Sequence, residues 1–311
     1  MSSTSAHEGY GKKAILAALL ANLGIALAKF VGFLLTRSSS LLAEAGHSLA
    51  DTTNQGLLLL GGRQANRAED AEHEFGHGMA RYFWSFVVAL ILFSLGSLFA
   101  LYEGFSKLGH PHELEKPGIA IGILAVAAAL ETYSFRTAIK ESRDLKATQS
   151  WWSFIRNSKV PELPILLLED SGALIGLAIA LVATALTALT DNAAFDAYGT
   201  IAIGGLLGVI AVILIVEMRS LLLGEAATPE AKQLIQAAIS ETPNVTRFIH
   251  ARTVHLGPEE LLVTAKVEMD ASLSFVDVAA CIDAIETRIR TVVPEARVIY
   301  IEPALYDPSR A

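Results

Sequence analysis

Two pairs of potential metal ligands are spaced four residues apart in the sequence. His73 and His77 enclose a glutamate in the stretch HEFGHG (73–78), which fits the H-E-x-x-H pattern of zinc metalloproteases. His47 and Asp51 form the second pair, and residues four apart lie on one face of a helix, roughly 6 Å from each other. Imidazole and carboxylate groups suit zinc and similar divalent ions. The sequence therefore offers two chemistries, namely metal-assisted peptide hydrolysis or the holding of a metal for another purpose.

The elements that position these residues are predicted to be membrane helices. The 311-residue chain is 52% hydrophobic and 18% charged, whereas a soluble domain is usually about 25% charged. A membrane span needs about 20 mostly apolar residues. Six segments meet this length, at roughly 13–36, 39–62, 81–107, 117–140, 163–189 and 194–222. The second, fourth and fifth also carry ionisable residues, which lowers their hydropathy: His47, Asp51, Glu131, Glu169 and Asp170.

The distribution of basic residues predicts the orientation of these spans. One side of the predicted bundle carries most of the Lys and Arg: Lys12, Lys13, Arg63, Arg67, Arg81, Lys140, Arg143, Lys146, Arg156, Lys159 and Arg219. The other side carries Arg37, Lys107 and Lys116. Because cytoplasmic loops are enriched in basic residues, we expect both termini in the cytoplasm. A plasma membrane of a bacterium is expected, since we see no organelle presequence, and the net charge of -8 argues against nucleic acid as a partner.

The last part of the chain, 225–311, is predicted to be a separate α+β domain after a membrane domain at 1–224. Thr228-Pro229 is a helix start. Helices are expected at 229–241 and from about 275 to 292, and strands at 245–256, 260–270 and 297–302. The order is α-β-β-α-β, with a three-stranded sheet.

Acidic residues within the predicted spans indicate a bound cation. Glu169 and Asp170 interrupt an apolar run, and Glu44 and Asn54 extend the His47 stripe. An Asp at a helix centre costs about 2.5–3.5 kcal/mol on insertion. We find no Lys or Arg within the spans to neutralise these groups, so a metal ion or protons are expected to do so. The alternative is that the polar residues bond the helices to one another.

Together these stretches resemble the cation diffusion facilitator family, and in particular its zinc transporter 9-like branch. The resemblance rests on the α-β-β-α-β tail and on three stretches, SSSLLAEAGHSLADTTNQG (38–56), HEFGHG (73–78) and LLLEDSGALIG (166–176). It implies six spans, a ferredoxin-like cytosolic dimerisation domain, and a transport site with ligands on the second and fifth spans. The ligands implied here are His47, Asp51, Asp170 and Glu169.

The resemblance also implies a second metal site in the loop between the second and third spans. Its ligands would be Asp70, His73 and His77, with Glu74 at a variable position of the family's His-x-Phe-Gly-His-Gly pattern. Gly76 weakens the continuous helix that a protease would need. A polar clasp between helices is the alternative role for these histidines.

Two departures from the family pattern bear on the metal. Leu166 stands four residues before Asp170, where the family has His or Asp, so Glu169 or a water would complete the site. Manganese, cobalt and iron therefore stay open beside zinc. In the tail, Lys266 and Ile301 stand where relatives carry histidines, and we expect dimerisation without a strong metal cluster there.

The predicted function is export of a divalent cation, most simply Zn²⁺, in exchange for protons through a homodimer in the lipid bilayer. Metal and protons compete for the same ligands, which couples their movements if the site opens alternately to each side. Gly204-x-x-x-Gly208 would allow close helix packing or would face lipid. The rival hypotheses are an intramembrane metalloenzyme using residues 73–77 and a metal sensor that transports nothing.

Overall fold

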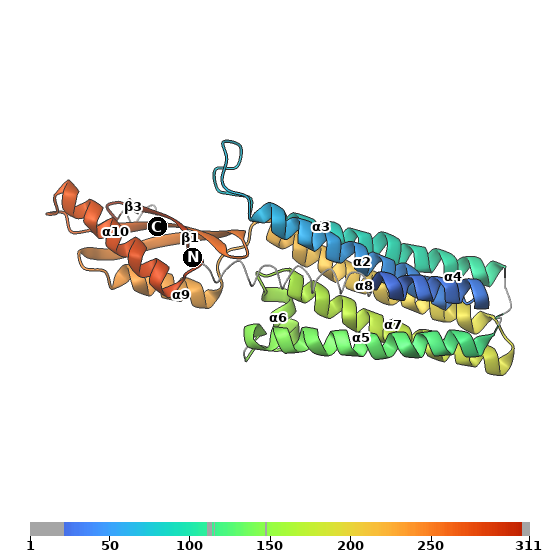
Figure 1. Cartoon of the computed structure of the whole chain (residues 1–311). Coiled ribbons are helices and arrows are strands. Elements are labelled where there is room, and N and C mark those ends of the chain that lie inside the picture. Colours follow the sequence, from blue (N-terminus) through green and yellow to red (C-terminus); the bar gives the residue numbers. More distant parts are fainter. Residues whose placement is uncertain (1–21, 111–113, 115, 147, 307–311) are drawn as a thin grey trace, which may run out of the picture. The chain divides into compact units, whose positions relative to one another are not determined.

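The computed structural model describes residues 22–306 except 111–113, 115 and 147 (Figure 1). A helix at Asn22–Thr36 comes first. The labelled elements that follow are α2 (Ser39–Ala65), α3 (Ala80–Ile91), the π-helical segment η1 (Leu92–Leu98), α4 (Phe99–Gly109), α5 (Pro117–Lys146), α6 (Trp151–Asn157), α7 (Glu162–Thr190), α8 (Ala194–Leu223), α9 (Pro229–Ser240), β1 (Val245–Gly257), β2 (Glu260–Met269), α10 (Phe275–Val292) and β3 (Val298–Pro303). The chain divides into two compact units, Met1–Gly61 with Trp84–Met218, and Gly62–Phe83 with Arg219–Ala311.

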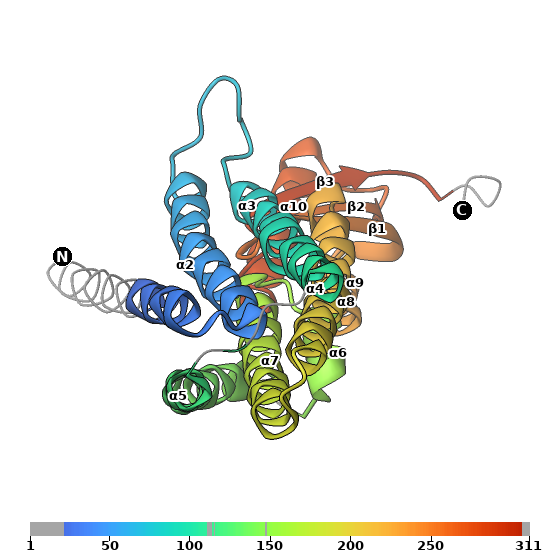
Figure 2. The same cartoon turned by 90° about the vertical axis from the view of Figure 1, so that its right-hand side faces the viewer.

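Four helices of the first unit are long and apolar enough to cross a membrane. They are Ala80–Gly109, which joins α3, η1 and α4, and then Pro117–Lys140, Glu162–Thr190 and Ala194–Leu223. Each begins and ends within two residues of a predicted span. The helices run alongside one another, and α5 packs along α7 (Figure 2).

The first two predicted spans are not among the described helices that meet both the length and the hydropathy expected of a membrane span. Residues 13–21 of the span at 13–36 lie outside the described residues, and the described part is the shorter apolar helix Asn22–Thr36. The span at 39–62 is a continuous 27-residue helix, α2, but it is not among the helices apolar enough to be membrane spans by composition. The reason is its polar stripe, because buried Glu44, His47 and Asn54 lower its hydropathy.

Glycines allow α8 to pack closely against η1 and α4 within the bundle. A Cβ atom on Gly204 would lie 2.8 Å from the backbone nitrogen of Leu101, and one on Gly208 would lie 2.8 Å from Ser97 Oγ. The Ser97 hydroxyl also donates to the Gly204 carbonyl oxygen at 2.8 Å. Gly204 is buried, so the close-packing interpretation of this motif is correct and the lipid-facing alternative is wrong.

The second unit contains a three-stranded sheet in the order β1-β2-β3, with β1 antiparallel and β3 parallel to β2. Alternate residues of β2 are buried, as the sequence period predicts. Val263 and Val267 pack with Ile235 of α9 and Ile285 of α10 in one core. The Thr228 side chain caps α9, and Ser274 forms a capping box with Asp277 at the start of α10. The helices and strands of this region therefore follow the predicted order.

Candidate metal centres

The stripe on α2 contains the first candidate centre. His47 is 1% exposed and its Nδ1 atom lies 3.4 Å from Asp51 Oδ1, so one helical face carries both groups as their spacing predicts. Both ring nitrogens of His47 and the Oδ1 atom of Asp51 are buried without a hydrogen-bond partner among the described residues. Buried polar atoms are nearly always satisfied. These unpaired nitrogen and oxygen atoms are of the types that coordinate a divalent cation.

Helix α7 directs the carboxylates of Glu169 and Asp170 to different neighbours. Glu169 Oε1 accepts a 2.5 Å hydrogen bond from the side-chain amide of Asn54 on α2. Asp170 Oδ2 accepts a 3.2 Å hydrogen bond from the hydroxyl of Ser134 on α5. Successive residues on a helix point about 100° apart, which explains the divergence. Both carboxylates nevertheless act electrostatically on Asp51.

The four predicted membrane ligands are therefore neighbours but do not form a closed set. Within the described part of the chain, their ligand atoms are not gathered as closely as those of the loop centre below. Asn54 ties Glu169 to α2 and Ser134 ties Asp170 to α5. The arrangement holds ligands on two helices, α2 and α7, which the hydrogen bond between Asn54 and Glu169 joins.

The expectation that the spans contain no basic residue is wrong. Lys29, in the helix Asn22–Thr36, is fully buried, and its ammonium donates to Glu44 Oε2 at 3.1 Å and to Ser48 Oγ at 2.8 Å. Sequence reasoning overlooked Lys29 because it is a single basic residue in an apolar run. The signal was available, since an ionisable residue within a predicted span is itself a sign of a functional or paired position.

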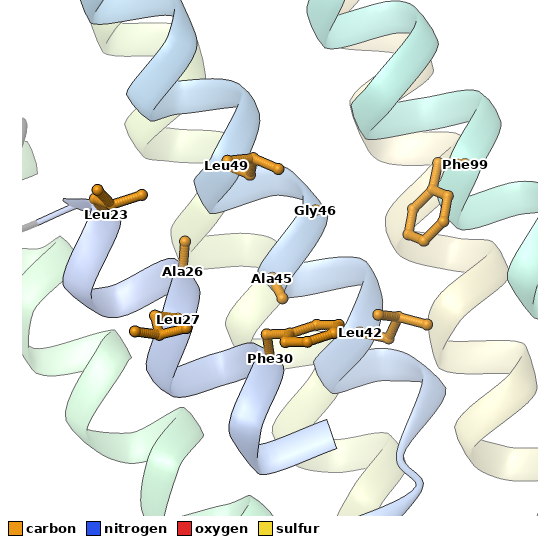
Figure 3. Close-up of a pocket in the computed structure, with 9 residues that line it drawn as sticks. All are labelled: Leu23, Ala26, Leu27, Phe30, Leu42, Ala45, Gly46, Leu49 and Phe99. Carbon is orange, nitrogen blue, oxygen red and sulfur yellow. The ribbon is translucent and has the colours of Figure 1, made fainter. Parts of the chain in front are cut away.

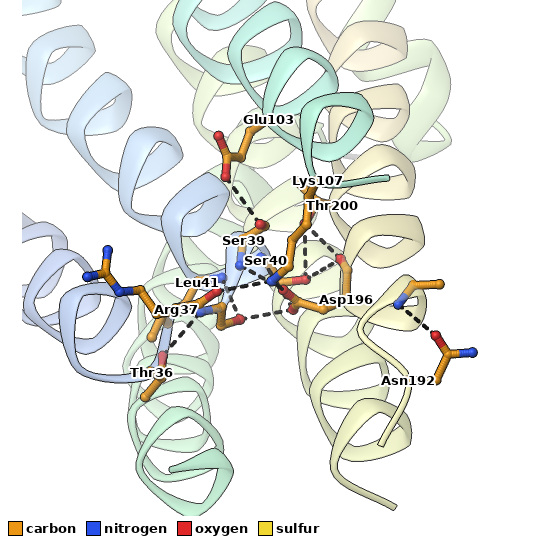
Figure 4. Close-up of polar contacts among 12 residues, drawn as sticks. Thr36, Arg37, Ser39, Ser40, Leu41, Glu103, Lys107, Asn192, Asp196 and Thr200 are labelled. Atoms are coloured by element: carbon orange, nitrogen blue, oxygen red, sulfur yellow. Dashed lines mark hydrogen bonds and ion pairs between the residues drawn. The ribbon is translucent and has the colours of Figure 1, made fainter. Parts of the chain in front are cut away.

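A second buried ion pair was also missed, at the end of the bundle where α2 begins (Figure 4). Lys107 donates to Asp196 Oδ2 at 2.7 Å. The same carboxylate accepts the backbone N–H groups of Ser39 and Ser40 at 2.7 and 3.4 Å. An anion at a helix N-terminus is stabilised by the unpaired N–H groups and the helix dipole. Asp196 thus fixes the first turn of α2 to α4 and α8.

One apolar pocket of the bundle does not belong to a metal centre. It has a volume of about 320 Å³ and lies between the helix Asn22–Thr36, α2 and Phe99 (Figure 3). Its lining includes Leu23, Phe30 and Leu49 and offers no ionisable side chain.

The loop between α2 and α3 contains the second candidate centre. Potential ligand atoms of Asp70, His73 and His77 all lie within 4.8 Å of one another. His73 Nδ1 is 3.3 Å from Asp70 Oδ1, and His77 Nε2 is 3.1 Å from Asp70 Oδ2. The backbone N–H of His73 donates to Asp70 Oδ1 at 2.8 Å. This hydrogen bond, together with those from the Glu72 backbone N–H and from the two imidazoles, lowers the pKa of Asp70 to about 2.

The local backbone excludes the helical H-E-x-x-H geometry of a protease. Residues 73–77 form turns rather than a helix, and Gly76 adopts a φ of +79°, which favours glycine. The N–H of Gly76 bonds to the His73 carbonyl oxygen at 3.0 Å. The two histidines therefore meet because the chain turns back, with ring centroids 4.3 Å apart, and not because they are one helical turn apart.

Long apolar helices with buried carboxylates and an open imidazole define a multi-pass membrane protein whose interior suits cations. Two family profiles agree with this class: "Cation efflux transmembrane domain" matches residues 15–223 and "Cation efflux protein, cytoplasmic domain" matches residues 227–304. The chain belongs to the cation efflux, or cation diffusion facilitator, family. Its architecture is accordingly a helical transmembrane domain with a small cytosolic α/β domain. The members are metal transporters, so the metalloenzyme hypothesis is not supported.

Several curated proteins are similar to the chain. It is 33% identical over 245 residues to "Proton-coupled zinc antiporter SLC30A9, mitochondrial" of Mus musculus. The matched region covers 78% of this chain and 43% of that protein. It is 27% identical over 272 residues to "Metal tolerance protein C4" of Arabidopsis thaliana, with 86% and 59% covered. It is 28% identical over 288 residues to "Cation-efflux pump FieF" of Serratia proteamaculans, with 93% and 91% covered. The chain spans less than half the length of the zinc antiporters that it matches.

Proposed function

We propose that this protein exports divalent cations, foremost Zn²⁺, in exchange for protons. The observation that carries the proposal is the pair His47 and Asp51, whose buried, open ligand atoms lie on the helix that contacts the Glu169 carboxylate of α7. The zinc antiporters named above support zinc and proton coupling. Manganese, cobalt and iron are the secondary candidates, because an incomplete second pair departs from a tetrahedral zinc site.

In this proposal Asp170 completes the site with the α2 pair, and Glu169 contributes from the neighbouring position. Asp170 is held by one neutral hydroxyl, Ser134 Oγ, at 3.2 Å. A dication binds a carboxylate more strongly than a hydroxyl does, so Asp170 can exchange Ser134 for the ion. Glu169 has to give up the shorter bond from Asn54. We therefore expect Asp170→Asn to reduce transport more than Glu169→Gln.

Proton coupling in this proposal follows from the chemistry of the ligands. Carboxylates and imidazoles bind metal only when deprotonated, so protons arriving from the far side displace the ion. An imidazole changes protonation nearest to neutral pH, which makes His47 the natural proton carrier. Alternating exposure of one site to the two sides then couples the two flows.

We further propose the finer architecture of the family for this chain. It comprises a six-span domain at 1–224 with cytoplasmic termini, and a ferredoxin-like dimerisation domain at 225–311. We also propose a homodimer in a bacterial plasma membrane; one relative that the chain matches over 91% of its length, a cation-efflux pump, comes from the bacterium Serratia proteamaculans. In the cytosolic domain, the Lys266 ammonium lies 3.0 Å from Glu302 Oε1, and this ion pair supports the expectation that the domain dimerises without a strong metal cluster.

The test is zinc flux into proteoliposomes with an imposed pH gradient. The wild-type protein should accumulate zinc when the gradient is applied and not when it is collapsed. Asp51→Ala should abolish the flux, because it removes one of the two ligands of the α2 pair. An Asp51→Ala protein that transports at the wild-type rate would contradict the site. A wild-type protein that binds zinc and moves none would support a sensor instead.

A further inference from the structure

A buried ion pair lies beside the proposed transport site without belonging to its ligands. Lys29 and Glu44 are both 0% exposed, and their charged atoms are 3.1 Å apart. Glu44 precedes His47 by three residues, which places it on the same helical face about 4.5 Å along the axis. Lys29 and Glu44 both act electrostatically on His47 and on Asp51. A positive and a negative charge are thus built into the wall of the site.

Glu44 has an unused ligand atom that faces α7. Its Oε2 atom contacts Lys29, whereas Oε1 is buried with no hydrogen-bond partner in the described part of the chain. A Cβ atom on Gly176 of α7 would lie 2.6 Å from Oε1, so a side chain at Gly176 would occupy the space that Glu44 uses. A buried carboxylate needs a cation, a proton or hydrogen-bond donors. Without Lys29, Glu44 would be a free anionic ligand one turn from His47.

The comparison with the other buried ion pair shows that this arrangement is not a general feature of the bundle. Asp196 uses both carboxylate oxygens: Oδ1 accepts from Ser38 Oγ at 2.9 Å, and Oδ2 accepts from Lys107 and from the Ser39 backbone. Its hydrogen bonds fix three helix ends, as expected of a structural pair. Glu44 has Lys29 on one oxygen and nothing on the other among the described residues.

We propose that Lys29 is a resident cation of the transport path that keeps Glu44 out of the metal-ligand set. This inference rests on the proposed function. The tethered ammonium satisfies Glu44, so an arriving dication meets His47, Asp51 and the α7 carboxylates and is not held by a further anion. Lys29 therefore limits how tightly the site retains metal. It is a positioning residue, since it acts through Glu44 and through its charge.

The test is a double-mutant cycle on zinc binding and zinc flux. Binding is measured by equilibrium dialysis of the full-length protein in detergent, in an Asp70→Ala background that removes the loop centre. Lys29→Met leaves Glu44 as a free anion, so zinc binding should tighten and turnover should slow. Glu44→Gln leaves Lys29 as a free cation, so zinc binding should weaken. Each change should be at least about tenfold, because a unit charge within about 10 Å of a dication exceeds that factor even at an effective dielectric constant of about 20.

The double variant and a matched control separate this inference from a structural role. Lys29→Met with Glu44→Gln removes both charges and should return zinc affinity close to the wild-type value. Lys107→Met breaks the other buried pair, and it should lower the melting temperature without changing zinc affinity. If Lys29→Met cannot be purified, Glu44→Gln alone still tests the predicted sign.

The inference would be overturned if both single variants changed zinc affinity in the same direction, or if neither variant changed it. Such a result with a wild-type protein that transports zinc through Asp51 would leave the proposed function intact. A wild-type protein without Asp51-dependent zinc binding would instead refute the proposed function itself.

Discussion

Gly204 and Gly205 are consecutive glycines of α8 with opposite surroundings, and they allow a sharp test of the helix packing. A Cβ atom on Gly204 would lie 2.8 Å from the backbone nitrogen of Leu101 and 2.8 Å from its Cγ atom, whereas a Cβ atom on Gly205 would meet nothing within 4 Å. We predict that Gly204→Ala destabilises the bundle and that Gly205→Ala does not.

The magnitude follows from two opposing effects. In a helix interior, Ala is favoured over Gly by about 0.5–1 kcal/mol, and this gain applies to both variants. Overpacking in a close-packed interior costs about 1–3 kcal/mol, and only Gly204→Ala incurs it, because a backbone atom of Leu101 cannot move aside as a side-chain end can. A further loss of about 1 kcal/mol follows if the hydrogen bond from Ser97 to the Gly204 carbonyl oxygen breaks. The two variants should therefore differ by about 1–4 kcal/mol.

Thermal unfolding in detergent, followed by intrinsic fluorescence, measures this difference directly. About 2–4 °C is expected for each kcal/mol in a domain of this size, so Gly204→Ala should melt several degrees below Gly205→Ala. Zinc flux should fall in the same order if α8 moves against α4 during transport. Equal melting temperatures for the two variants would refute the contact between α8 and α4 as described.

Three further predictions concern single side chains. Asp196→Asn should lower the melting temperature strongly, since loss of one member of a buried ion pair costs about 3–5 kcal/mol, and adding Lys107→Met should recover part of the loss. The folded-state pKa of Asp70, about 2, lies below the ordinary value of 3.8, so its stabilising effect on the loop is present above pH 4 and is lost as pH falls toward 2. The Asp70 carboxylate should therefore remain ionised at pH 5.5 as at pH 7, and an NMR titration that places its pKa at or above 3.8 would contradict this prediction. Glu74→Gln should leave zinc flux unchanged because Glu74 is exposed and contributes no ligand, whereas an H-E-x-x-H enzyme would lose activity.

Much of the fold could be predicted because its signals are local. Thr228 before Pro229, the alternation along 260–269 and the Ser274 capping box each act within a few residues, and the described elements of the second unit follow them. The four described helices that are long and apolar enough to cross a membrane were found from length and hydropathy alone. The short helix α6 and the π-helical segment η1 were not predicted, because tertiary packing and not local pattern decides such features.

The candidate site was predictable in its residue types but not in its partners. Spacing placed His47 and Asp51 on one face, and the structure agrees. That Glu169 turns to α2 and Asp170 to α5 depends on the rotation of α7 in the bundle, which no single segment encodes. Lys29 pairs with Glu44 across 15 residues, and the pairing required the first two described helices to be neighbours.

Two kinds of ionisable side chain in this bundle differ in how many of their polar atoms have hydrogen-bond partners. Asp196 binds four donors and is satisfied without any ion, which is how a buried carboxylate can stabilise a fold. His47 is almost as deeply buried and Asp51 is partly buried, yet they keep open ring nitrogens and an open oxygen within the described structure. A helix that existed only to pack would gain stability by satisfying or replacing these groups, since an unsatisfied buried polar group costs about 1–3 kcal/mol. That α2 retains them, at the expense of the hydropathy expected of a membrane span, is the strongest physical reason to regard them as ligands for a cation.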